Sequence, residues 1–136
     1  MPNVSVWMLR LSLVYLISGA GIGALLLFNK AVVVSYSLWA LLPVHIEMLI
    51  FGWIIQFTLG TAYWILPRFL ISKDRGNEYF AILMLVSLNA GILLVIVSEL
   101  FYQEPALALT GRILETLAVI LFAALHWKRI VSYASR

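Results

Sequence analysis

Long apolar runs separated by short polar stretches dominate the sequence. Four such runs lie at roughly 7–28, 38–66, 79–101 and 106–127, and each reaches the length of about 20 residues that a helix needs to cross a bilayer. Because backbone groups in lipid must be satisfied within the segment, these runs predict helices rather than strands. The pattern therefore predicts an all-α membrane protein, a single domain over 1–136 built as a bundle of four transmembrane helices.

The composition supports this prediction. Hydrophobic residues make up 64% of the chain and charged residues 11%, whereas about a quarter of the residues of a soluble domain are charged. Such a chain does not cover a water-facing surface, so membrane lipid is its expected surrounding. The chain has no cysteine, which excludes disulfides, thiolate catalysis, iron–sulfur clusters and c-type haem attachment. The net charge of +3 requires no nucleic acid partner.

The distribution of lysine and arginine predicts the orientation. Four helices place both termini and the central polar loop on one side of the membrane, and only Lys30 on the other, with Arg112 inside the fourth run. The basic residues of the first side are Arg10, Arg68, Lys73, Arg75, Lys128, Arg129 and Arg136. By the positive-inside rule this side is cytoplasmic, and we expect both termini in the cytoplasm of a prokaryotic-type inner membrane.

Most ionisable side chains within the runs fall toward the outer side. They are His45, Glu47, Glu99, Arg112 and Glu115. Ionisable residues inside a membrane are costly and usually face the bundle interior or a cavity, so such a group is a hypothesis for a functional site. His126 lies at the opposite, cytoplasmic end of the fourth run, where an interfacial position is expected.

His45 begins a polar stripe along the second predicted helix. At about 100° per residue, Gly52, Gln56 and Tyr63 fall almost directly below it, and Gly60 lies somewhat off the stripe. A haem needs an imidazole nitrogen as axial ligand, and its flat ring must approach the helix that offers it. A glycine near the ligand permits that approach. His45 and Gly52 are therefore candidate haem-binding residues, with His45 as the metal ligand.

Arg112 allows two interpretations. It is three residues from Glu115, so the two share a helix face and can form an internal ion pair. Alternatively, Arg112 binds haem propionates near the outer surface. Glu47 and Glu99 can pair with Arg112, bind a proton or a quinol hydroxyl, or face interfacial water. In the first run, Gly19 and Gly23 have the small-residue spacing typical of close helix packing.

The second run, "HIEMLIFGWIIQFTLGTAYWILPRF", resembles the second helix of the catalytic subunit of haem–copper oxidases. The likeness is closest to the cbb3-type oxidases and the nitric oxide reductases. It rests on the outer histidine, "FGW", Gly60, Tyr63 and "LPR". The glycine-rich first run, the loop before "NEYF" and the ending "HWKRI" are also similar, so the resemblance covers the first four helices of that subunit.

This resemblance implies that His45 is an axial ligand of a low-spin haem. In that family the second axial ligand and the copper-binding histidines come from later helices, which this chain lacks. The chain alone is therefore not expected to be a complete oxidase or reductase. The three four-helix arcs of the family imply that this chain forms a homo-oligomer, a trimer or a dimer, with haem near subunit interfaces. The sixth ligand is then His45 of a neighbour, Met48, or absent.

These observations predict a small b-type membrane cytochrome that binds haem b through His45. The sequence does not decide whether the haem transfers electrons to or from quinol or binds a gas. One alternative is a haem-free accessory or assembly subunit of a respiratory oxidase complex. Another is a small transporter or proton-handling protein that uses Glu47, Arg112 and Glu115 as a relay.

Overall fold

The computed structural model describes residues 1–66, 76–102 and 104–131. Within these residues four helical segments are long and apolar enough to cross a membrane: Asn3–Ala31, Tyr36–Ile65, Glu78–Phe101 and Pro105–Trp127. This confirms the all-α, four-helix membrane protein and places each span within a few residues of its predicted bounds. Four of the basic residues used to predict the orientation, Arg68, Lys73, Arg75 and Arg136, lie outside the described residues.

The spans differ in how regular they are. The first is one α-helix, whereas the second contains several helix types in succession and the third ends in a π-helical turn. In chain order the elements are α1 (Asn3–Ala31), a 3-10 helix (Tyr36–Leu41), α2 (Leu42–Glu47), a π-helix (Met48–Ile55), α3 (Gln56–Ile65), α4 (Glu78–Val97), a second π-helix (Ser98–Tyr102) and α5 (Pro105–Val131).

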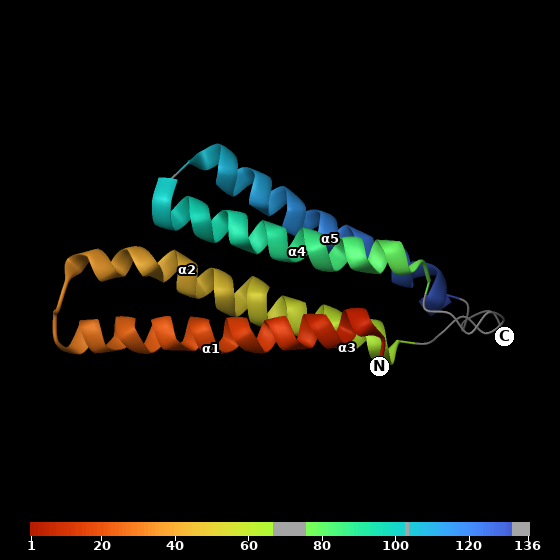
Figure 1. Ribbon diagram of the computed structural model, residues 1–136, viewed down its shortest axis with the longest axis horizontal. Helices are drawn as coiled ribbons and strands as arrows, with labels where there is room; N and C mark the ends of the chain where they lie inside the picture. Colours follow the sequence, from red (N-terminus) through yellow and green to blue (C-terminus); the bar gives the residue numbers. More distant parts are fainter. Residues whose placement is uncertain (67–75, 103, 132–136) are drawn as a thin grey trace.

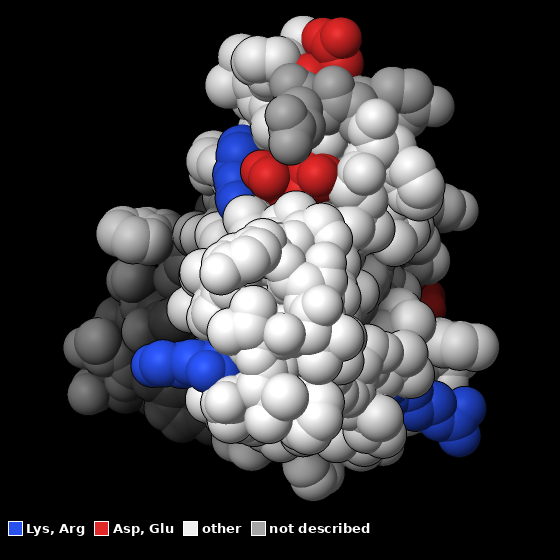
Figure 2. Space-filling view, turned by 90° about the vertical axis from the view of Figure 1, so that its left-hand side faces the viewer, with Lys and Arg blue, Asp and Glu red and all other residues white. Residues whose placement is uncertain are grey.

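The helices form two layers. The first layer pairs α1 with the span that contains α2 and α3, and the second pairs α4 with α5 (Figure 1). The start of α1 and the end of α5 lie at the same end of the molecule (Figure 1). Figure 2 views the opposite end, where most of the surface is uncharged and only a few basic and acidic side chains appear.

Asn29 builds the turn that brings the second span back against α1. Its side chain is 1% exposed, and its Oδ1 accepts hydrogen bonds from the backbone N–H groups of Val34 and Ser35, each at 3.0 Å. The two donors come from the segment just after the helix, where backbone groups have no intrahelical partner. The turn thereby sets the antiparallel register in which His45 meets α1.

Glycine allows close approach within the second layer. A Cβ on Gly91 of α4 would come within 2.7 Å of the Gly111 carbonyl oxygen, and a Cβ on Gly111 would come within 2.8 Å of the Gly91 carbonyl oxygen. The backbones of α4 and α5 therefore touch at this pair, as is common where small residues line helix interfaces in membranes. The contact places Arg112 and Glu115 of α5 facing the first layer.

The π-helix Met48–Ile55 was not expected from the sequence, which predicts one continuous α-helix. Its i→i+5 hydrogen bonds widen the turn, so the faces before and after it no longer follow the spacing of about 100° per residue. Gly60, expected off the stripe, packs against Met8 of α1, where a Cβ would come within 2.8 Å of the Met8 Cβ. Tyr63, expected on the stripe, contacts the ring of His126 in α5.

Candidate functional site

His45 lies against α1, held by two glycines of that helix. The Nδ1 atom is 2.8 Å from the carbonyl oxygen of Gly19. Because a carbonyl can only accept, Nδ1 donates the hydrogen bond, and in the neutral ring Nε2 then carries the lone pair. The ring rests on Gly23, where a Cβ would come within 2.5 Å of the His45 Cε1. The close packing predicted for Gly19 and Gly23 is thus confirmed.

His45 and Gly23 both line an open groove between α1 and the second span. The groove has a volume of about 230 Å³, somewhat below the ~300–1,000 Å³ typical of ligand pockets. Its lining is apolar except for the imidazole of His45 and the ammonium of Lys30. The lining residues are Gly23, Leu26, Leu27, Lys30, Trp39, Leu42 and His45.

Gly52, a candidate haem-binding residue, lies against α1. Its space is filled by the ring of Tyr15 in α1: a Cβ on Gly52 would come within 2.5 Å of the Tyr15 Cγ. Gln56, four residues further on, is fully buried and donates from Nε2 to the Met8 carbonyl oxygen at 3.2 Å. The polar stripe of His45, Gly52 and Gln56 therefore faces α1, and Gly52 provides room for helix packing.

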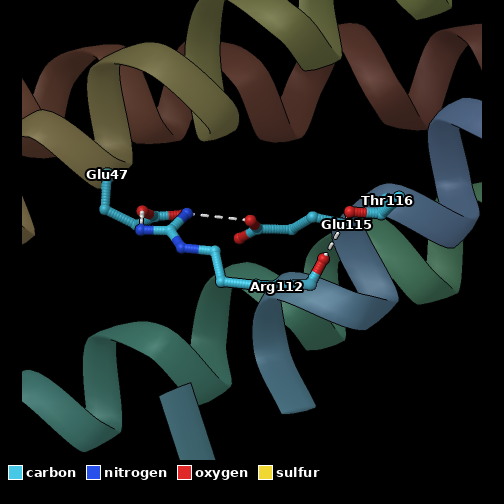
Figure 3. A network of polar contacts seen from close by, with 4 residues as sticks. All are labelled: Glu47, Arg112, Glu115 and Thr116. Atoms are coloured by element: carbon cyan, nitrogen blue, oxygen red, sulfur yellow. Dashed lines mark hydrogen bonds and ion pairs between the residues drawn. The ribbon is translucent and has the colours of Figure 1, made fainter. Parts of the chain in front are cut away.

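Arg112 forms ion pairs with two buried carboxylates (Figure 3). Its Nη2 is 2.7 Å from Oε2 of Glu47, and its Nη1 is 2.8 Å from Oε2 of Glu115. The carboxylate side chains are 3% and 2% exposed, whereas that of Arg112 is 46% exposed. The predicted Arg112–Glu115 pair is therefore present, and Glu47 joins it across the two layers.

Aromatic packing supports this ion cluster. The guanidinium carbon of Arg112 lies 4.9 Å from the centroid of the Phe51 ring, within the range of a cation–π contact. Phe51 belongs to the π-helix Met48–Ile55. Glu99, for which pairing with Arg112 and an interfacial position were both open, is partly exposed in the π-helical turn at the end of the third span. It is not one of the two acids that Arg112 contacts.

His126, expected at the cytoplasmic end of the fourth span, has a side chain that is buried between helices. The residue is 1% exposed, because its ring packs between Phe122, at 4.1 Å between centroids, and Tyr63, at 5.8 Å. Its Nδ1 donates to the Phe122 carbonyl oxygen at 2.7 Å. Tyr63 lies eighteen residues after His45 on one helical span, roughly 25 Å away. One haem cannot reach both histidines within a chain.

The three predicted site residues are not brought together in one chain. His45 and Glu47 are two residues apart and point to different sides of the helix, His45 toward α1 and Glu47 toward Arg112 of α5. Arg112 therefore lies across the helix from the imidazole, and Gly52 lies under Tyr15. Over the described residues, no three His, Cys, Asp or Glu side chains converge as a metal-binding group.

His45 itself fits the requirements of an axial ligand. Metal-binding histidines usually donate their second ring N–H to a carbonyl or carboxylate, as Nδ1 does here to Gly19. The donor atom and the apolar groove suit one face of a haem. The groove is open, so one chain covers only that face.

Sequence reasoning missed Tyr15, Lys30 and Phe51 as neighbours of the candidate residues. The signal for Lys30 was available, since it is the basic residue in the last turn of α1, close to the turn that leads to His45. Tyr15 contacts Gly52 from another helix, and Phe51 contacts Arg112 from the π-helix Met48–Ile55, which the sequence did not predict.

No protein-family model, curated protein or solved structure matches this chain. The resemblance of the second span to haem–copper oxidases therefore stays a prediction.

Proposed function

We propose that this chain is a small b-type membrane cytochrome that holds haem b on Nε2 of His45. The observation that carries the proposal is the hydrogen bond from Nδ1 to the Gly19 carbonyl, at 2.8 Å, beside an apolar groove. The bond fixes the ring and leaves Nε2 as the lone-pair donor. The localisation that we propose is the inner membrane of a prokaryotic-type cell, with both termini in the cytoplasm.

The groove residues suggest how the haem would be held. Leu26, Leu27 and Leu42 supply apolar contacts, and the ammonium of Lys30 provides a counter-charge for propionates. We assign propionate binding to Lys30 rather than to Arg112, because Arg112 is already paired with Glu47 and Glu115. A bound haem supplies one-electron chemistry, and the axial ligand, hydrogen bonding and burial tune its potential.

A second copy of the chain completes the proposed site. One chain covers a single haem face, and closed symmetry is the usual form of a homo-oligomer. Met48 of the same chain is not a suitable sixth ligand, because it lies three residues from His45 on the same helix and packs on Gly19. A neighbour's His45 would give a six-coordinate electron carrier, and an open position would give a gas-binding haem.

A haem-free accessory subunit of a respiratory complex is the second candidate. The observation that favours it is the contact between Gly52 and Tyr15, which closes the helix face below His45 without any cofactor. This interpretation predicts a colourless chain that gains stability only with its partner subunits.

The test is the absorption spectrum of the detergent-purified chain, oxidised and reduced with dithionite, after expression with haem supplied. We expect a Soret band that disappears in His45→Ala and persists in His126→Gln, the matched change at the second of the two histidines. Sharp reduced α and β bands indicate two axial ligands, and broad bands indicate an open position. A colourless wild-type chain, or a band that survives in His45→Ala, overturns the proposal.

A further inference from the structure

Arg112 presents an exposed cationic group to a groove of its own. Its side chain is 46% exposed although both of its carboxylate partners are buried. The exposed side faces an open groove along α5 with a volume of about 390 Å³, within the range of ~300–1,000 Å³ for small-molecule sites. The other lining residues are Leu109, Ile113, Thr116, Leu117 and Ile120.

Arg112 lies within the fourth apolar span, Pro105–Trp127, rather than at its end. Arg112 is seven residues into α5, which begins at Pro105, so it is about 10 Å along the helix from its outer end. A long arginine side chain can often reach the interface. Here the ion pair with Glu115, almost one turn deeper, holds it inward. Exposed N–H groups at this depth are costly without an acceptor.

The charges of the cluster define which acceptor suits the groove. A guanidinium has five N–H donors, and the two ion pairs engage its terminal nitrogens from the sides of Glu47 and Glu115. The carboxyl groups of Glu47 and Glu115 already pair with the guanidinium, so the groove offers N–H donors without an uncompensated positive charge, which disfavours a phosphate or another anion. The hydroxyl of Thr116 is already used, since it donates to the Arg112 carbonyl oxygen at 2.8 Å.

We propose that this groove binds an oxidised membrane quinone. A quinone is uncharged, flat and apolar, and it carries carbonyl oxygens that accept hydrogen bonds. Its ring would lie along Ile113 and Leu117, with one carbonyl oxygen accepting from Arg112. A quinone bound here would exchange electrons with the haem of the cytochrome, and this electron-transfer role rests on the proposed function. The binding itself rests only on Arg112 and the groove.

The experiment is photo-crosslinking in proteoliposomes with a photoreactive short-chain benzoquinone, followed by mass spectrometry. We expect crosslinks to α5 between Leu109 and Ile120 that an excess of unreactive short-chain benzoquinone removes. Ile113→Trp fills the groove and should lower this competed crosslinking by about tenfold. Leu93→Trp is the matched control. It lies on α4 at a similar depth and is 54% exposed, against 58% for Ile113.

Arg112→Lys tests the hydrogen bond, because it keeps the charge and removes the planar set of donors. We expect it to weaken the competed crosslinking as well. Equal crosslinking in Ile113→Trp and Leu93→Trp overturns the proposal. The proposal is also overturned if α5 of the wild-type chain shows no crosslinks that the unreactive benzoquinone removes. That result is expected if lipid or a second copy of the chain covers the groove. If the chain is colourless but binds the quinone, only the cytochrome proposal fails. If the chain binds haem but not the quinone, only the quinone proposal fails.

Discussion

Gly23 lies directly against the imidazole of His45. A Cβ at Gly23 would come within 2.5 Å of the His45 Cε1 and 3.0 Å of its Nδ1. The same ring donates to the carbonyl oxygen of Gly19, one turn earlier on α1. The first helix therefore positions His45 in two ways. The carbonyl oxygen of Gly19 accepts its hydrogen bond, and the absence of a side chain at Gly23 leaves room for its ring.

Gly23→Ala should displace the His45 ring. The added methyl group overlaps the ring, and such overpacking typically costs about 1–3 kcal/mol. We expect a lower Tm in detergent and, for a cytochrome, a weaker Soret band per chain. Gly21→Ala is the control, because a Cβ at Gly21 meets nothing within 4 Å. Equal Tm values for the two variants would contradict the described contact.

Gly52→Ala separates a packing role from a haem role. The new Cβ would come within 2.5 Å of the Tyr15 Cγ, so we expect a loss of about 1–3 kcal/mol in unfolding free energy with or without haem. Adding Tyr15→Leu should recover part of that loss, since the ring is removed. A variant that keeps its stability but loses its haem would instead place the cofactor over Gly52.

Arg112→Leu should destabilise the chain strongly. It leaves the buried carboxylates of Glu47 and Glu115 without their cation, and breaking a buried pair in this way costs about 3–5 kcal/mol. Thermal unfolding in detergent measures the loss. The triple variant that also carries Glu47→Gln and Glu115→Gln removes the uncompensated charges and should recover much of the stability. A single variant as stable as the wild type would show that the ion cluster contributes little.

Single cysteine substitutions can test the orientation, because the chain has no cysteine of its own. Val33→Cys places a thiol at a residue that is 59% exposed in the turn after α1, and Glu78→Cys places one at the start of α4. With the termini in the cytoplasm, a membrane-impermeant maleimide added to intact cells should label the Val33→Cys variant readily. The Glu78→Cys variant should react only after the membrane is opened. The reverse pattern would invert the topology.

The four spans could be predicted from the sequence because length and hydropathy determine them almost alone. The ion pair between Arg112 and Glu115 could also be predicted, since their spacing of three residues places them on one helix face. The packing of Gly19 and Gly23 followed from their spacing as well. In each case the evidence is local to one helix.

The misses concern contacts between helices. After the π-helix Met48–Ile55, Gln56 and Gly60 still face α1, whereas Tyr63, predicted to continue the stripe, contacts His126 of α5. The depth of His126 could be predicted, but its burial depends on Phe122 and Tyr63. Likewise, no spacing within the second span reveals that Tyr15 occupies the space beside Gly52.

The ion cluster has a consequence for the order of events during synthesis. Glu47 belongs to the second span and its cation to the fourth, so the ribosome delivers the acid well before the base. Until α5 enters the membrane, Glu47 has no partner from that helix, and the incomplete chain carries a carboxyl group that is costly to keep in lipid. A nascent chain that stalls before its last helix therefore keeps Glu47 without the cation of Arg112, and the insertion of α5 supplies it.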